Sequence, residues 1–169
     1  YRGRGGATLS ALAIDSSKKF VGVNIGDSRI YTIRDGKLEA LSTDDTLSAV
    51  YGGEGKGLIQ FVGVGEGLKP HVIDVSEIDQ NLFITSDGLH YVDNSLLSEI
   101  FVRSPDPKSS GESALAVARW LGSPDNASII ALDSHKLLTS LQSSNSLNGV
   151  EVNGTSGDLK LLVLDELEG

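Results

Sequence analysis

The sequence predicts an α+β fold in which antiparallel strands supply most of the core. Short apolar runs separated by tight turns fill the first half of the chain, and two segments with helical periodicity lie in the second half. Hydrophobic residues make up 39% of the 169 residues. This length suits one domain, and this composition is sufficient for a core of its own.

The first half of the chain predicts strands at residues 7–14, 20–25, 30–33 and 37–41. The turn Asp35-Gly36 between the last two is a strong hairpin signal, because both residue types tolerate positive φ. Short connections between successive strands are typical of an antiparallel meander. We expect the strand at residues 7–14 to be buried over much of its surface. Residues 44–69 are rich in glycine and lack periodicity, which predicts an irregular segment with extra backbone freedom.

The second half predicts strands at residues 71–75, 82–86 and 127–132. Two helices are expected before the last of these strands, at residues 95–102 and at about 110–121, with Asn94 capping the first. The inner stripe of the second helix is expected to contain Leu115, Ala118 and Leu121, and Trp120 is expected in the core. Gly122 is a natural cap at its C-terminal end. In the tail, residues 150–152 and 159–164 are expected to pair as a hairpin.

Charge and composition exclude several classes of function. A net charge of −9 argues against nucleic acid as the main partner, and the absence of cysteine excludes disulfides and thiolate chemistry. No apolar run is long enough to span a bilayer. A cytoplasmic location is therefore expected, and the oligomeric state is left open.

Three short motifs each place one carboxylate at a tight turn beside an apolar run. They contain Asp27, Asp87 and Asp125. Carboxylates at strand ends converge in space while lying far apart in the sequence, and they repel one another unless a cation lies between them. Mg²⁺ and Mn²⁺ favour such all-oxygen sites. The alternative is that each is an ordinary turn residue, because Asp caps its own backbone.

The order and context of these motifs resemble the metal-dependent protein phosphatases of type 2C, the PPM family. The resemblance covers about residues 5–133. It rests on residues 6–8, 11–14, 21–31, 41–45, 82–89 and 122–130. The family's usual His after the pair Asp44-Asp45 is replaced here by Thr46. We expect both of these aspartates to be solvated or to form a turn, without a role in metal binding.

The resemblance implies a two-sheet antiparallel β-sandwich flanked by helices, in α-β-β-α layers, over residues 1–133. Residues 134–169 would be a tail, either an added hairpin, an interaction segment or a linker. The implied activity is hydrolysis of phosphoserine or phosphothreonine on proteins, using two or three Mn²⁺ or Mg²⁺ ions. The implied metal ligands are Asp87, Asp125 and Asp27. No catalytic residue beyond these ligands is identified, and the implied partner is a phosphorylated protein substrate.

The front part of the family carries a metal-bridging Asp, in an Asp-Gly-His-Gly-Gly-like motif, and an upstream phosphate-binding Arg. Neither is found here, and the sequence contains no Met. We therefore expect a fold that is incomplete at the N-terminus and a chain that is nearly inactive by itself. One alternative is a catalytically inactive regulatory module of the same fold. Another is a cation-stabilised β-sandwich with an unrelated binding role.

The three histidines carry weaker predictions. His90 follows Asp87 closely, so a role in proton transfer is conceivable, but packing in the core is favoured. His71 and His135 are expected at the surface.

Overall fold

The computed structural model describes residues 5–14, 19–53, 57–75, 81–143, 149–154 and 157–162. The chain divides into two compact units, Tyr1–His135 and Lys136–Gly169. Each unit is described by itself. Within the described residues, no helix is long and apolar enough to cross a membrane.

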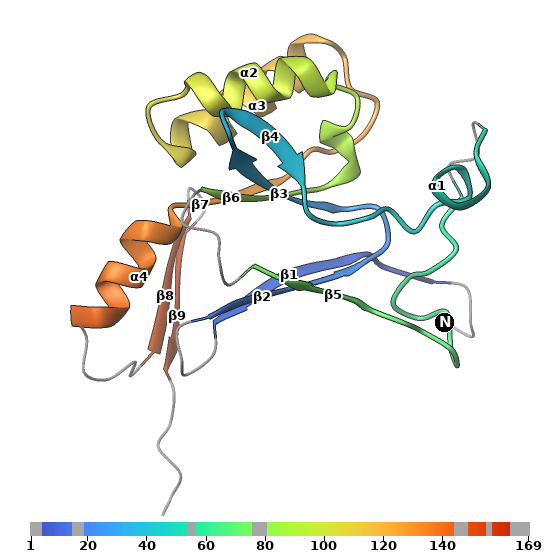
Figure 1. The fold of residues 1–169 in the computed structure, drawn as a ribbon, viewed down its shortest axis with the longest axis horizontal. Coiled ribbons are helices and arrows are strands. Elements are labelled where there is room, and N and C mark those ends of the chain that lie inside the picture. Colours follow the sequence, from blue (N-terminus) through green and yellow to red (C-terminus); the bar gives the residue numbers. More distant parts are fainter. Residues whose placement is uncertain are drawn as a thin grey trace, which may run out of the picture. The chain divides into compact units, whose positions relative to one another are not determined.

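The described strands of the first unit form two antiparallel sheets. One sheet has the order β1-β2-β5 and the other β4-β3-β6-β7. The strands are β1 (Leu9–Ile14), β2 (Phe20–Ile25), β3 (Arg29–Arg34), β4 (Lys37–Ala40), β5 (His71–Asp74), β6 (Leu82–Thr85) and β7 (Ile129–Leu132). Figure 1 shows the two sheets as separate layers, with the helices α2 and α3 over the four-stranded sheet. The predicted α+β fold with two antiparallel sheets is confirmed.

The two sheets pack face to face where Gly22 of β2 meets Ile30 of β3. A Cβ built on Gly22 would lie 3.4 Å from Ile30 Cδ1 and 3.3 Å from Ile73 Cβ. Because glycine has no side chain, the fully buried Ile30 fits against the backbone of β2. The prediction of extensive burial for residues 7–14 is wrong, since every residue of β1 is half-buried or exposed.

The hairpin between β3 and β4 is confirmed. Asp35 and Gly36 have φ values of 52° and 70°, as a two-residue turn of this twist requires. The predicted meander holds only inside each sheet. β2 and β3 are consecutive in the sequence but belong to different sheets. The chain changes layer at Gly26, whose φ is 97°, and this corner carries Asp27.

Three helices of the first unit have aspartate or threonine at their N-terminal cap. Thr46 caps the short helix α1 (Leu47–Tyr51). Asp93, rather than the expected Asn94, caps α2 (Asn94–Arg103). Asp106 caps α3 (Pro107–Trp120), which begins at proline because the first helical turn needs no N–H there. The helix α3 therefore starts three residues earlier than expected.

The core between the helices and the four-stranded sheet contains a pair of stacked aromatic rings. Phe83 of β6 and Phe101 of α2 lie with their ring centroids 4.3 Å apart, and both are fully buried. The predicted inner stripe of α3 is correct at Ala118, but Leu121 is 37% exposed. Trp120 is 83% exposed, so the prediction that it belongs to the core is wrong. Gly122 has the positive φ expected of a C-terminal cap, at 75°.

The second unit contains most of the helix α4 (Ser134–Ser143) and a two-stranded sheet. The strands β8 (Gly149–Gly154) and β9 (Gly157–Leu162) pair antiparallel. Val150 lies opposite Leu161, and Val152 lies opposite Leu159. The predicted pairing in the tail is confirmed over the described residues, and residues 163 and 164 lie outside them.

Candidate functional site

All three predicted aspartates line one cavity of ≈ 420 Å³ in the first unit. Asp27 comes from the β2–β3 corner, Asp87 from a short 3₁₀ turn after β6, and Asp125 from the loop between α3 and β7. The described residues that line the cavity are Asp27, Arg29, Asp44, Thr46, Ser48, Asp87, Gly88, His90, Tyr91, Ser123, Pro124 and Asp125. The cavity wall is therefore rich in carboxylates, which is the convergence that the sequence predicts.

The turns that carry Asp87 and Asp125 are held together by close backbone contact. A Cβ built on Gly88 would lie 2.3 Å from the carbonyl oxygen of Asn126, a distance that no side chain tolerates. The Ser123 hydroxyl donates a hydrogen bond to the Gly88 carbonyl at 2.8 Å. Gly88 is therefore required by the close approach of these two turns.

Two serines next to these turns, Ser86 and Ser128, also hold the two segments together through hydrogen bonds. The Ser86 N–H donates to the Ser128 carbonyl at 3.0 Å, and the Ser128 N–H donates to the Ser86 hydroxyl at 2.9 Å. Asp125 accepts a hydrogen bond from the Asn126 N–H at 2.7 Å through one carboxylate oxygen. Asp87 and Asp125 are both exposed, so each carboxylate is open to solvent in the cavity.

Asp27 is half-buried and lies in the field of the other carboxylates. Burial raises the pKa of Asp27, and the charges of Asp87 and Asp44 raise it further. Among the described residues no ion pair joins Asp27 to the nearby Arg29, whose guanidinium is bound by Asp44.

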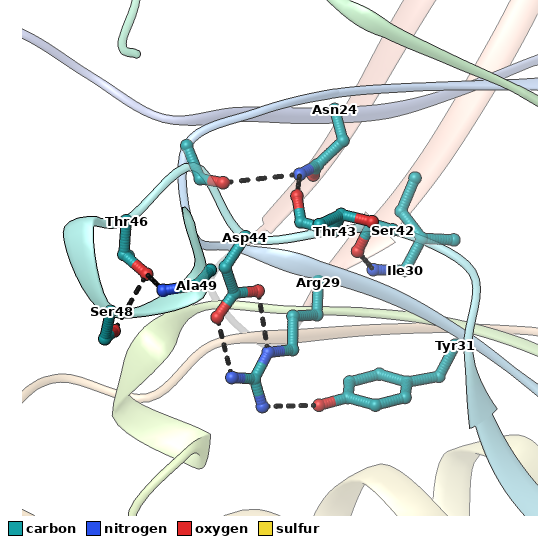
Figure 2. Close-up of polar contacts among 11 residues, drawn as sticks. Asn24, Arg29, Ile30, Tyr31, Ser42, Thr43, Asp44, Thr46, Ser48 and Ala49 are labelled. Carbon is teal, nitrogen blue, oxygen red and sulfur yellow. Dashed lines mark hydrogen bonds and ion pairs between the residues drawn. The ribbon is translucent and has the colours of Figure 1, made fainter. Parts of the chain in front are cut away.

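Arg29 and Asp44 form the strongest ion pair of the cavity wall. Nε and Nη2 of Arg29 donate to the two carboxylate oxygens of Asp44 at 2.9 and 2.7 Å, and Nη1 donates to the Tyr31 hydroxyl at 3.2 Å. Figure 2 shows Asp44 and Tyr31 on opposite sides of the guanidinium. The hydrogen bond to Asp44 is the main reason that the pKa of Arg29 is raised. The expectation that Asp44 is merely solvated or turn-forming is therefore wrong.

Asp45 is 3% exposed and joins three segments. Its carboxylate accepts hydrogen bonds from the Gly26 N–H at 2.9 Å, from Gln60 Nε2 at 2.9 Å and from His71 Nε2 at 2.8 Å. Burial by itself would raise the pKa of Asp45, but these hydrogen bonds outweigh burial and hold the pKa below its ordinary value. Asp45 thus fixes the corner that carries Asp27, and the expectation that it is solvated is wrong.

His90 is half-buried beside the cavity. Burial lowers its pKa to about 4, and the charge of Arg29 acts in the same direction. Its Nε2 atom is buried and has no hydrogen-bond partner within the described part of the chain. A neutral imidazole in this position agrees with the favoured packing role rather than with a histidine that is charged at neutral pH.

Sequence reasoning missed the roles of Arg29, Asp44 and Asp45. Arg29 belongs to the same motif as Asp27, and the pair Asp44-Asp45 belongs to the resemblance over residues 41–45. The sequence offers one weak signal for these roles. Arg29 and the pair Asp44-Asp45 flank predicted strands, and residues that flank strands can meet at one edge of a sheet. The pairing itself joins residues 15 positions apart, which no local pattern specifies.

The chain is similar in sequence and in fold to known protein phosphatases. No family model matches the sequence. The serine/threonine protein phosphatase PstP of Mycobacterium tuberculosis is 27% identical over 76% of this chain, and the match covers 27% of PstP. The chain thus spans about a quarter of the length of the curated relatives that it matches.

Solved structures give a closer view of the fold. The PPM Ser-Thr phosphatase MsPP of Mycobacterium smegmatis, in complex with cacodylate, has a TM-score of 0.68 and 29% identity, over 78% of this chain and 66% of MsPP. The PstP catalytic domain in complex with two manganese ions has a TM-score of 0.63 and 28% identity, over 75% of this chain and 58% of that chain. The sequence and the fold of this chain are thus similar to those of PPM-type serine/threonine phosphatases.

A third neighbour is PppA of Pseudomonas aeruginosa, described as a key regulatory component of the type VI secretion system. It has a TM-score of 0.67 and 28% identity, over 75% of this chain and 56% of PppA. The relatives named here include serine/threonine phosphatases, one of them with two bound manganese ions.

The cavity fits divalent ions in its donor chemistry. Asp27, Asp87 and Asp125 offer carboxylate oxygens, which are the ligands that Mg²⁺ and Mn²⁺ prefer. Burial is the main cause of the raised pKa of Asp27, and the charge of Asp87 raises it further. A bound cation would relieve the repulsion between Asp27 and Asp87. Within the described residues, however, no three His, Cys, Asp or Glu side chains form a group that could hold a metal ion. The three aspartates therefore line an open cavity rather than form a closed cage.

Proposed function

We propose that the natural protein containing this chain hydrolyses phosphoserine and phosphothreonine monoesters on proteins. The observation that carries this proposal is that Asp27, Asp87 and Asp125, from three separate turns, line one cavity. The relatives that share this fold are serine/threonine phosphatases, which supports the same class of reaction. The role of the three aspartates as metal ligands is part of the proposal.

Asp27, Asp87 and Asp125 would hold the metal in the cavity that they line. Mn²⁺ or Mg²⁺, when bound, supplies Lewis acidity toward water and toward the phosphoryl group. The residues of the chain supply the positions. Gly88 keeps the Asp87 and Asp125 turns in contact, and Asp45 fixes the corner on which Asp27 lies.

The same arrangement leaves the cavity open to a macromolecular substrate. Asp87, Tyr91 and Asp125 are exposed at its wall, so a phosphorylated side chain that projects from a polypeptide can enter without a change in the fold. Phosphate esters of this kind carry charge that only cations or fixed N–H donors can offset. A phosphorylated protein is therefore the proposed partner.

The first test is phosphate release from a phosphothreonine peptide by the natural full-length protein with Mn²⁺. Asp87→Asn removes one ligand charge, and we expect it to weaken Mn²⁺ binding and to lower turnover by about 100-fold or more. Asp35→Asn is the matched control, because Asp35 is an exposed hairpin residue outside the cavity whose φ asparagine also adopts. It should leave both quantities unchanged.

Two outcomes would contradict the proposal. Unchanged Mn²⁺ affinity of Asp87→Asn in a calorimetric titration would remove Asp87 from the metal site. No chelator-sensitive phosphate release from the folded, full-length protein would favour a regulatory module that keeps the fold without the reaction.

A further inference from the structure

Arg29 is a cation in the wall of an acidic cavity. Of the described residues that line this cavity, four are aspartates and Arg29 is the one arginine or lysine. Its side chain is 24% exposed, so part of the guanidinium reaches the open space. Arg29 is not one of the proposed metal ligands, so metal binding does not explain its position in the cavity.

The guanidinium is held in one orientation by two neighbours. Asp44 accepts from Nε and Nη2, which occupies one edge of the planar group. Tyr31, which is 3% exposed, accepts from Nη1 on the opposite side. A planar group fixed on two sides loses little conformational freedom when it binds a further partner. Arg29 is therefore preorganised.

The remaining N–H groups lie on the outer edge of the guanidinium. An arginine has five N–H donors, and the contacts to Asp44 and Tyr31 use one on Nε, one on Nη2 and one on Nη1. One N–H on Nη1 and one on Nη2 remain, and these two point in parallel away from the aliphatic stem. Among the described residues no protein acceptor is bound there. This pair has the spacing that binds two oxygens of a phosphate or carboxylate at once.

We propose that Arg29 is a phosphate-binding residue of the cavity and holds the phosphoryl group of the substrate through this outer edge. The inference rests on the proposed function, because it assigns a second anchor to the same substrate. Among carboxylate walls, a phosphate ester is repelled unless fixed donors or cations face it. Arg29 supplies such donors from the cavity wall. Asp44 holds the guanidinium in its orientation without occupying the outer edge.

A purely structural role for Arg29 makes different predictions. If Arg29 served only to fix the segment around Asp44, replacing it would lower stability and turnover together and would leave the affinity for free phosphate unchanged. A phosphate-binding Arg29 instead affects the affinity for inorganic phosphate and the KM for substrate more than kcat. The affinity for phosphate is thus the decisive quantity.

The experiment is a calorimetric titration of the natural full-length protein with inorganic phosphate in the presence of Mg²⁺. Arg29→Lys keeps the charge but loses the planar fork, and we expect phosphate affinity to fall by about tenfold or more. The KM for a phosphothreonine peptide should rise by a similar factor. Mg²⁺ affinity should stay within about twofold of the wild-type value, because Arg29 is not a metal ligand.

Two further variants complete the test. Arg34→Lys is the control, since Arg34 lies on the same strand in an exposed pair with Glu39, and it should bind phosphate like the wild type. Tyr31→Phe keeps Arg29 but removes the hydroxyl that orients Nη1, and it should weaken phosphate binding by about threefold. If Arg29→Lys fails to fold, Tyr31→Phe decides the question by itself.

The outcomes separate this inference from the proposed function. Unchanged phosphate affinity in folded Arg29→Lys, or in Tyr31→Phe if the first variant does not fold, would overturn the role of Arg29 while leaving the hydrolysis proposal intact. Absence of phosphate binding by the wild-type protein would also overturn it. Absence of hydrolysis, with phosphate binding that depends on Arg29, would refute the phosphatase reaction and keep the anion site.

Discussion

Gly88 is the residue on which the geometry of two candidate ligands depends. A methyl group at this position would meet the Asn126 carbonyl at 2.3 Å, so the turns that carry Asp87 and Asp125 would have to separate. We expect Gly88→Ala to destabilise the protein by about 3 kcal/mol and to weaken Mn²⁺ binding. Urea unfolding and a calorimetric titration with Mn²⁺ measure the two effects.

The matched control for Gly88→Ala is Gly5→Ala, because nothing lies within 4 Å of a Cβ at Gly5. It should change neither stability nor Mn²⁺ affinity. Wild-type stability in Gly88→Ala would show that the two turns are not in the contact described here.

Asp45 predicts a pH dependence of stability with a definite sign. Its folded pKa lies below the ordinary value of 3.8, so the unfolded chain takes up a proton at this residue first as the pH falls. The contribution of Asp45 is therefore fully present well above pH 3.8 and is lost as the pH falls below it. Urea unfolding of the wild type and of Asp45→Asn between pH 6 and about pH 3 isolates the effect as a difference.

Asp45→Asn should be less stable by about 2 kcal/mol at neutral pH, because the amide cannot accept all of the hydrogen bonds that the carboxylate accepts. The difference in the free energy of unfolding between the wild type and Asp45→Asn should become smaller as the pH falls. Glu39→Gln, in an exposed ion pair, is the control. A difference in unfolding free energy that stays constant down to the lowest pH would contradict the role assigned to the ionised carboxylate.

At this scale the sequence predicts some roles and misses others for a physical reason. Asp27, Asp87 and Asp125 are recognisable because each lies next to a glycine, serine or asparagine at the end of an apolar run. The partners of Arg29 and Asp45 are not recognisable, because each contact joins strand ends that meet only after the sheets form. Local sequence patterns carry no information on such tertiary contacts.

The helix α2 is attached to its sheet through an aromatic stack. Phe101→Ala should cost about 4 kcal/mol, since it removes a fully buried ring that stacks on Phe83. Trp120→Ala, near the end of α3, should cost less than about 0.5 kcal/mol, because the indole is 83% exposed. Chemical unfolding followed by circular dichroism compares the two variants directly. Similar losses in both would contradict the burial described here.

The elements themselves were largely predictable, and the errors lie at their ends and faces. The strands and helices follow from apolar periodicity and from turn residues such as Asp35-Gly36. The helix α3 starts at Pro107, before the predicted position, because proline is favourable in the first helical turn. Trp120 was placed in the core because large aromatic residues are usually buried, and only the tertiary packing decides which face of α3 is covered.

The whole molecule divides into two units, and this division can be tested by truncation. A chain that ends at Ser143 keeps the whole of the first unit and the helix α4 but lacks β8 and β9. We expect its melting temperature to shift by less than about 4 °C, the change that 1 kcal/mol produces in a domain of this size. Thermal unfolding followed by circular dichroism measures the shift. A chain that fails to fold would show that the first unit depends on the second.

At the scale of the molecule, the sequence predicts the fold class through the order of its motifs but not the assignment of strands to sheets. The corner at Gly26 sends consecutive strands into different layers, and a succession of short turns gives no sign of this change. The proposed boundary at residue 133, and the role of the tail, stay predictions.

The carboxylate of Asp45 links the corner of the cavity to His71, and this link makes His71 a reporter of ligand binding in the cavity. One of its oxygens accepts from the backbone at Gly26, next to Asp27, and the other accepts from the half-exposed imidazole of His71. A ligand that shifts the corner in the cavity must therefore alter the electronic surroundings of that imidazole. Because the sequence contains three histidines, the ring protons of His71 offer a sparse, assignable nuclear magnetic resonance signal of occupancy, without any label at the site itself.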